Sequence, residues 1–444
     1  MKIRQCVLGM ALVGAAMLFF GAVPARAVNI QRVVSPGGIE AWLVHNSAPM
    51  IALEFAIRGS ADQDPADKSG VAALVASLLD EGAGPYDAMA FHARLERGAI
   101  EMSFRAGRDY LRGSLRCLGD NRDEAFEYLR LSLTQPHFEA EAVERMRAQM
   151  MSGLRREAVS PTELASRNWW ATAFPGHPYG RPVDGTLETL PRITVDDLRS
   201  YSARVLARDN LKIAVVGDLD AQAAGALLDR TFGGLPAKAE LAAVNPITAQ
   251  GLGRRIVIKL DVPQAAVNFG APGISRSDPD FMAAYIVNHI LGGGSFSSRL
   301  YREVREKRGL AYGISDSLVW LNQTALIIGH TATRADATGK TIEIIEQEAR
   351  RLAAEGPTEE ELAKAKSYLK GSFALALDTS NAIASQLVQM QVDNLGIDYI
   401  ERRSALIDAV TLADTKRVAK RLLDNGLLIT VVGRPEGLAS HEGG

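Results

Sequence analysis

The feature that most constrains the fold of this sequence is an internal repeat. Three residues of the first half recur 214 positions later, where Phe55, Gly59 and Asp64 are repeated as Phe269, Gly273 and Asp278. A strand-like apolar run at 211–217 also recurs, 216 positions later, at 427–433. A nearly constant offset of this size predicts two tandem copies of one domain of about 200 residues, not a short-period solenoid.

The order of the predicted elements indicates the fold class. In the first half, extended patterns at 39–45 and 50–58 precede a helical pattern at 70–79. The second half repeats this order, with extended patterns between 255 and 270 before a helical pattern at 280–291. Strands grouped ahead of helices, rather than in strict alternation with them, favour an α+β fold with antiparallel sheets.

We therefore predict two similar α+β domains, at residues 28–233 and 254–444. Each is expected to have an antiparallel sheet covered on one side by helices, and the two are expected to face each other as a clamshell. Residues 234–253 contain Gly, Pro and Ala without a clear period, which is typical of a linker between domains.

Residues 1–27 are predicted to be a secretory signal peptide. Lys2 and Arg4 precede an apolar run at 7–23, and Ala25-Arg26-Ala27 forms a small-residue cleavage site. An uncleaved membrane anchor is the alternative, but a run of about 17 residues is short for a bilayer span. No similar run follows, so the mature protein is expected to be soluble and periplasmic, with no membrane association after cleavage.

The charge and cysteine content exclude some classes of protein. Removing residues 1–27 takes away three basic residues and no acidic one, which leaves 47 basic against 52 acidic residues and a net charge of −5. A mildly acidic chain without basic clusters gives no electrostatic reason to expect nucleic-acid binding. Only Cys117 remains after cleavage, so no intramolecular disulfide can form.

The two copies differ in their reactive side chains. The second copy carries a dense polar segment at 292–312, whereas the matching part of the first copy, at 70–79, offers almost no reactive group. The run of three glycines that opens this segment is not a phosphate loop, because it lacks the Gly-Lys-Ser/Thr ending and follows a predicted helix rather than a strand.

This segment carries a resemblance to a known family. The run from Asn288 to Leu300, followed by Arg305-Glu-Lys-Arg-Gly-Leu-Ala-Tyr312, closely resembles the C-terminal half of the insulinase, pitrilysin and mitochondrial-processing-peptidase superfamily. In the first half, His177-Pro-Tyr-Gly-Arg-Pro-Val-Asp-Gly185 resembles a segment of that family's N-terminal domain. The resemblance covers essentially the whole mature chain and implies the same two-domain fold.

The resemblance also shows what this chain lacks. Active members bind zinc through an inverted His-x-x-Glu-His on a helix, with a further Glu about 76 residues later. The corresponding positions here are Ala73, Ala76, Ser77 and Gly153, none of which can supply a zinc ligand or a catalytic base. We therefore expect this chain to bind no metal and to be inactive alone.

The second half keeps a pair of polar residues that the family uses. An Arg and a Tyr seven positions apart, which reach toward the zinc site in family members, match Arg305 and Tyr312. Arg305 is expected at the end of a helix, Gly309 at a turn and Tyr312 at the start of the next strand. The resemblance implies that they are catalytic donors to the developing oxyanion. The alternative is a solvated arginine and a core tyrosine.

The resemblance places a third group of residues beside the substrate. It implies that the start of the polar segment forms a cavity wall, where missing side chains let a peptide backbone approach. The alternative for the glycines is a helix C-cap and tight turn. The residues concerned are Gly292, Gly293, Gly294, Ser295 and Phe296.

These observations lead to one functional hypothesis and two alternatives. The hypothesis is a metal-free subunit of an exported heterodimeric zinc peptidase, whose homologous partner carries His-x-x-Glu-His and the zinc and acts on peptides. A non-enzymatic scaffold or peptide-binding protein of the same fold is the first alternative. A peptidase active by itself is disfavoured by Ala73, Ala76 and Ser77.

Overall fold

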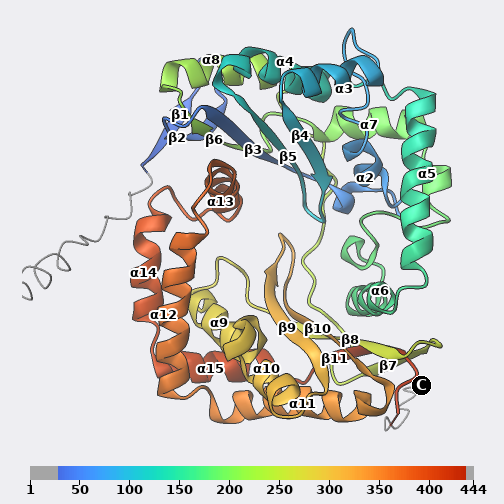
Figure 1. Cartoon of the computed structure of the whole chain (residues 1–444), viewed down its shortest axis with the longest axis vertical. Helices are drawn as coiled ribbons and strands as arrows, with labels where there is room; N and C mark the ends of the chain where they lie inside the picture. The colour runs from blue at the N-terminus through green and yellow to red at the C-terminus, as the bar shows by residue number, and fades with distance from the viewer. Residues whose placement is uncertain (1–28, 437–444) are drawn as a thin grey trace, which may run out of the picture.

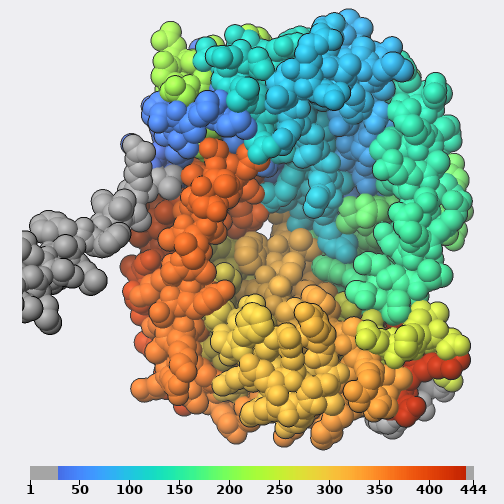
Figure 2. All heavy atoms as spheres, viewed as in Figure 1, coloured from blue at the N-terminus to red at the C-terminus, as the bar shows by residue number. Residues whose placement is uncertain are grey.

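Each half of the chain forms one β-sheet with helices packed on it. The computed structural model describes residues 29–436, and the predicted signal peptide lies outside them. The two sheets face each other, with the first half above and the second below in Figure 1. Figure 2 shows a hollow between the halves. Among the described residues, no helix is both long and apolar enough to cross a membrane.

The first sheet has six strands in the order β1-β2-β6-β3-β5-β4. All neighbours are antiparallel except β2 and β6, which are parallel. Its strands are β1 (Ile30–Val34), β2 (Glu40–His45), β3 (Met50–Arg58), β4 (Glu101–Ala106), β5 (Tyr110–Leu118) and β6 (Leu211–Gly217).

The second sheet has five strands in the order β7-β11-β8-β10-β9. Again one pair, β7 and β11, is parallel and the other neighbours are antiparallel. Its strands are β7 (Arg255–Lys259), β8 (Gln264–Pro272), β9 (Ala311–Trp320), β10 (Ala325–Arg334) and β11 (Leu428–Gly433). Without β1, the two sheets have the same order and directions, so the repeat seen in the sequence is also a repeat of topology.

The same cross-strand pair lies at the centre of both sheets. Phe55 is opposite Gly113, and Phe269 is opposite Gly329. Both phenylalanine rings are buried, and each covers its glycine so closely that a Cβ there would come within 2.2 Å of a ring carbon. An aromatic ring that covers a strand glycine in this way fills the space left by the missing side chain.

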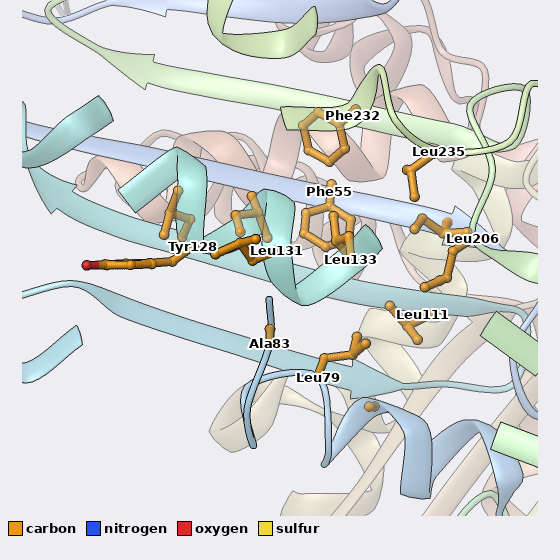
Figure 3. Close-up of a cluster of buried hydrophobic side chains, with 14 of the residues drawn as sticks. Phe55, Leu79, Ala83, Leu111, Tyr128, Leu131, Leu133, Leu206, Phe232 and Leu235 are labelled. Atoms are coloured by element: carbon orange, nitrogen blue, oxygen red, sulfur yellow. The ribbon is translucent and has the colours of Figure 1, made fainter. Parts of the chain in front are cut away.

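Helices cover the outer face of each sheet. The core of the first half packs Phe55 and Leu111 of the sheet against Leu131 and Phe232 of two helices (Figure 3). The helices of this half are α2 (Val71–Ala76), α3 (Ala88–Arg97), α4 (Arg122–Thr134), α5 (Ala140–Glu157), α6 (Pro161–Ala173), α7 (Val195–Val205) and α8 (Ala221–Phe232). Those of the second half are α9 (Phe281–Asn288), α10 (Arg299–Tyr301), α11 (Thr338–Glu355), α12 (Glu359–Leu375), α13 (Ser380–Val392), α14 (Tyr399–Ala409) and α15 (Leu412–Leu423).

The two halves exchange one helix each. Helix α6 of the first half packs on β8 and β11 of the second sheet, where Trp169 is fully buried and its Nε1 donates to the Leu428 carbonyl at 3.0 Å. Helix α13 of the second half packs on β3 and β6 of the first sheet, with Leu387 against Trp42 in one apolar cluster. The predicted α+β fold with two facing sheets is confirmed, and the structure adds these helices on the inner faces.

The halves also meet through the turns of two hairpins. The carboxylate of Asp109, in the β4–β5 turn, accepts from the Tyr179 hydroxyl at 2.5 Å and from the backbone N–H of Asn322, in the β9–β10 turn, at 2.7 Å. The Tyr179 hydroxyl also accepts from the Gln323 backbone N–H at 3.1 Å. Tyr179 belongs to the His-Pro-Tyr-Gly segment that the sequence singled out, and the structure gives it a packing role.

The segment between α8 and β7 contains no helix or strand, but it is tied to both halves. Ala242 N–H donates to the Gln63 side chain at 2.7 Å, and Ile247 N–H donates to the Gln323 carbonyl at 3.0 Å. This segment contains the predicted linker, and the exact limits of the two domains stay a prediction.

Candidate functional site

Arg305 lies in a short π-helical turn, Arg302–Glu306, that follows α10. Its Nη1 donates a hydrogen bond to the hydroxyl of Tyr301, four residues earlier. Its guanidinium carbon lies 4.7 Å from the centre of the Tyr312 ring and 5.0 Å from that of Tyr301. Two aromatic faces within about 6 Å of a guanidinium hold it by cation–π attraction, so the position of Arg305 is fixed from two sides.

Tyr312 is the second residue of β9 and is 87% exposed. Gly309 lies in the left-handed region, with φ of 60°, and turns the chain between the π-helical turn and this strand. The predicted sequence of helix end, glycine turn and strand start is therefore what the structure has. An exposed tyrosine that contacts a fixed arginine leaves its hydroxyl free to donate to a ligand.

Arg305 and Tyr312 lie on the wall of an open cavity of about 670 Å³. Phe296 also lines it, is 69% exposed, and packs edge-on against Tyr301 with ring centres 5.0 Å apart. The remaining lining side chains of strands β8, β9 and β10 are mostly small or uncharged, with Arg334 as a second cation. All lining residues fall between Gln264 and Arg334, so the cavity belongs to the second half.

The three glycines of the predicted substrate wall have close contacts of their own. A Cβ at Gly292 would come within 2.7 Å of the Asp316 carboxyl carbon, and one at Gly294 within 2.7 Å of the His289 carbonyl oxygen. Of this segment, Ser295 and Phe296 line the cavity. Dense packing thus explains the glycines, including Gly293 beside Asn288, and their contact with a substrate stays a prediction.

A buried polar pair supports this segment. The Asn288 side chain donates to Asp316 at 2.6 Å and accepts from the Leu318 backbone N–H at 3.1 Å. Burial raises the pKa of Asp316 well above its usual value. Sequence reasoning missed this pair, and it also missed Tyr301, although its spacing of four from Arg305 is the separation that brings side chains together on a helix.

The positions that match the zinc ligands lie in the first half. Ala73 and Ala76 are buried in α2, and the hydroxyl of Ser77 at its end donates to the Leu74 carbonyl at 2.9 Å. Gly153 lies in α5. Methyl groups, an engaged hydroxyl and a glycine are not a zinc donor set. Across residues 29–436, no three His, Cys, Asp or Glu side chains are grouped so that they could hold a metal ion.

A buried carboxylate fixes the start of this helix. Asp64 accepts from the backbone N–H groups of Gly70 and Ala72, at 2.8 and 3.0 Å. Its repeat counterpart Asp278 instead pairs with Arg421 at the surface. The first half therefore keeps the helix cap that would orient a metal-binding helix, without the ligands.

Comparisons with known proteins agree with this arrangement. A family model described as the peptidase M16 inactive domain matches residues 192–369. The non-peptidase homolog YmxG of Helicobacter pylori is 28% identical and aligns with 74% of this chain and 76% of its own length. An uncharacterized zinc protease of Streptomyces coelicolor is 26% identical, over 91% of this chain and 90% of that protein.

A solved structure extends the likeness to the whole architecture. The peptidase M16 inactive domain from Pseudomonas fluorescens superposes with a TM-score of 0.86 at 29% identity, covering 93% of this chain and 100% of that one. The chain is thus similar to members of the M16 peptidase family over almost its whole length. The resemblance drawn from the polar segment is thereby confirmed, and the matches to inactive M16 members agree with the missing zinc ligands in α2 and α5.

Proposed function

We propose that this M16 chain is the metal-free subunit of a two-chain zinc peptidase, to which it contributes Arg305 and Tyr312. The observation that carries the proposal is the contact of these two side chains on the wall of the 670 Å³ cavity, in a chain whose zinc-ligand positions are Ala73, Ala76 and Ser77. A homologous subunit with His-x-x-Glu-His would supply the zinc and the base.

The chemical role of the pair follows from the charge that develops during peptide hydrolysis. When water attacks a peptide carbonyl, negative charge collects on its oxygen, and donors already fixed beside that oxygen stabilise the transition state more than the substrate. Arg305 is held by Tyr301 and Tyr312 before any substrate arrives. The exposed Tyr312 hydroxyl supplies a second donor.

The proposal includes a location and a substrate class. The sequence of residues 1–27 supports export and cleavage before Val28, and so a periplasmic peptidase. The hollow between the sheets and the open cavity suit short or unfolded peptides. Fractionation of a C-terminally tagged protein, with the mass of its mature N-terminus, tests the location; an intact N-terminus in the cytoplasm would contradict it.

The decisive experiment mixes this chain with its cognate subunit that carries His-x-x-Glu-His and follows cleavage of a quenched fluorescent peptide. Tyr312→Phe removes one hydroxyl, and Arg305→Ala removes the cation. Each should lower kcat by about 10²–10³, since this is the usual cost of losing one oxyanion donor. Arg308→Ala is the matched control, because Arg308 lies just after the π-helical turn but pairs with Glu303 and does not line the cavity, and it should leave kcat unchanged.

The second candidate function is a scaffold, and the non-peptidase name of the Helicobacter pylori relative favours it. In that case both variants would support full activity in the complex, and the chain would contribute only enclosure of the substrate. Assembly measured by size-exclusion chromatography must be the same for all variants.

A further inference from the structure

A second cavity, of about 390 Å³, lies where the two halves meet. We refer to it as the junction cavity. It is lined by the β4–β5 turn, the loop after β8, the β9–β10 turn and the end of α13, so both halves contribute to it. It shares no lining residue with the cavity of Arg305 and Tyr312.

The junction cavity is rich in arginine. Four guanidinium groups and two carboxylates line it: Arg105, Arg108, Arg112, Arg276, Asp109 and Asp393. Burial lowers the pKa of Arg112, and it lowers the pKa of Arg108 to about 10. These cations are thus held in a place where an unbalanced charge is costly.

Both carboxylates are already engaged by uncharged donors. Asp109 accepts from Tyr179 and Asn322, as described above. Asp393 accepts from Trp320 Nε1 at 2.9 Å and from the Gln389 amide at 2.8 Å, and its other oxygen lies 3.8 Å from Arg276. Neither acid forms a bidentate pair with an arginine of the cavity.

Arg276 pairs with Asp393, but among the described residues the other three arginines of the cavity form no ion pair. Arg112 donates to the Gln389 side-chain oxygen at 2.5 Å, and Arg108 donates to the Arg181 carbonyl at 3.2 Å while it stacks on Trp170. Within the part of the chain that the structure describes, Arg105 has neither a hydrogen-bond nor an ion-pair partner. Its charge acts at longer range on Asp184, where it offsets part of the rise in pKa that burial causes.

The pairing of β4 with β5 shows that this arrangement departs from ordinary sheet packing. On one face, Glu101 is opposite Arg116 and forms an ion pair, and Ser103 is opposite Ser114 with hydroxyls 2.7 Å apart. The next pair on that face is Arg105 opposite Arg112. Like charges directly opposite each other destabilise a sheet, and this pair lines the junction cavity.

We propose that the junction cavity binds the carboxylate of a peptide, with Arg105 and Arg112 as its principal ligands. Two guanidinium forks on neighbouring strands can take the oxygens of one carboxylate in charge-assisted hydrogen bonds. Trp320, Leu321 and Asn322 of the facing turn provide apolar surface and polar groups for the adjoining peptide. Such a ligand would offset the repulsion between Arg105 and Arg112.

The test uses this chain alone and isothermal titration calorimetry with three N-acetylated alanine pentapeptides. One has a free C-terminal carboxylate, one is amidated, and one is amidated with a central glutamate. The free acid, the glutamate peptide or both should bind at least about 10-fold more tightly than the plain amide, and their comparison identifies which carboxylate is recognised. Equal binding of all three peptides, or no binding, would overturn the proposal.

A variant of Arg105 tests whether this arginine is a ligand of the carboxylate. Arg105→Gln should weaken carboxylate binding by about 10-fold or more. The midpoint of thermal unfolding of this variant should stay the same or rise, because the repulsion between Arg105 and Arg112 is removed. Arg116→Gln, on the same face of the neighbouring strand β5 and outside the cavity lining, is the matched control, and it should bind as the wild type does. Unchanged affinity in a folded Arg105→Gln variant would reject the site. The site would also be rejected if inorganic phosphate displaced the carboxylate peptide while acetate at the same concentration did not.

This proposal does not depend on a catalytic partner. The binding assay contains no zinc subunit, and Arg305 and Tyr312 lie outside the junction cavity. A negative result would therefore remove the carboxylate site and leave the proposed function of the Arg305–Tyr312 pair untouched.

Discussion

Phe55 and Phe269 occupy the same place in the two sheets, and each ring covers a glycine of the next strand. The residues at 73, 76 and 77 have, by contrast, no metal-binding chemistry left. At the scale of residues, the features shared by the two halves are therefore those that packing requires. Arg305 and Tyr312 differ from these, because Tyr312 is largely exposed and contributes little to a core.

The glycine under Phe269 gives a first prediction. Gly329→Ala places a Cβ within 2.2 Å of the Phe269 ring and 2.7 Å of the Ser315 carbonyl oxygen, so it should lower the free energy of unfolding by about 1–3 kcal/mol. Gly371→Ala in α12 is the control: its Cβ meets no atom within 4 Å, and alanine should stabilise the helix by about 0.5–1 kcal/mol. Urea denaturation of both variants checks this; a stable Gly329→Ala protein would contradict the packing.

The raised pKa of Glu54 predicts that the stability of the folded protein depends on pH. Burial raises the pKa of Glu54 to about 7, and Arg112 opposes this only in part. An acid with a raised pKa in the folded state favours folding while it is protonated, so its contribution is complete below its unfolded pKa and is lost as the pH rises through 7. Glu54→Gln, which cannot ionise, should therefore be more stable than the wild type at pH 8, by on the order of 1–3 kcal/mol.

The comparison at low pH is the control for Glu54. At pH 4 the side chain is neutral in the folded wild type, so the two proteins should unfold at nearly the same temperature. A difference between wild type and Glu54→Gln that is the same at both pH values would show that the effect is not ionisation.

At the scale of elements, the reciprocal exchange of α6 and α13 connects the halves. Each sheet has apolar residues on its inner face that its own half does not cover, such as Ala266 and Val432 in the second sheet. These strands are therefore buried on both faces, as β3 and β11 show. The two halves thus depend on each other for the burial of their sheets.

Trp169 tests this exchange. Trp169→Ala should lower the free energy of unfolding by about 3–5 kcal/mol, because it empties a fully buried site over Gly270. Trp169→Phe keeps a ring and loses the hydrogen bond to the Leu428 carbonyl, so its cost should be smaller, about 1–2 kcal/mol. Val159→Ala, at an exposed position just before α6, should change stability by less than about 0.5 kcal/mol. Equal stability of all three variants would refute the exchange.

Local sequence patterns were sufficient to predict helices and strands that pack within their own half of the chain. The extended patterns at 39–45 and 50–58 match β2 and β3 to within one residue, and the helical pattern at 280–291 begins within one residue of the start of α9. Helices α6 and α13 were not predicted, because their apolar residues face the sheet of the other half. Helices α8, α14 and α15 and strand β1 were also missed, although α15 begins with a capping box of Thr411 and Asp414.

The candidate site was predictable for a different reason. The resemblance located Arg305 and Tyr312, and the glycine between them fixed the turn. The role of Tyr301 and the junction cavity depend on side chains that come together only in the folded chain. No local pattern in the sequence relates Arg105 to Arg276, which line the same cavity from different halves.

At the scale of the whole molecule, the chain has the architecture of an M16 peptidase without its metal ligands. The purified mature protein should therefore hold far less than one equivalent of zinc after dialysis and should cleave no peptide alone. Elemental analysis and a peptide-cleavage assay check this. One tightly held equivalent of zinc would overturn the assignment of Ala73, Ala76 and Ser77 as the former ligand positions.

The exchanged helices also have a mechanical consequence. In Figure 1, α6 crosses to the lower sheet on one side of the hollow and α13 reaches the upper sheet on the other, while the hairpin turns held by Asp109 interlock between them. Moving the halves apart would expose Trp169 of α6 and the aliphatic side chains of α13, because each helix is buried on the sheet of the opposite half. Widening the hollow between the halves would therefore cost buried apolar contacts on both sides of it. If a second chain completes the chamber, substrates enter where the chains meet, and admission is governed by assembly.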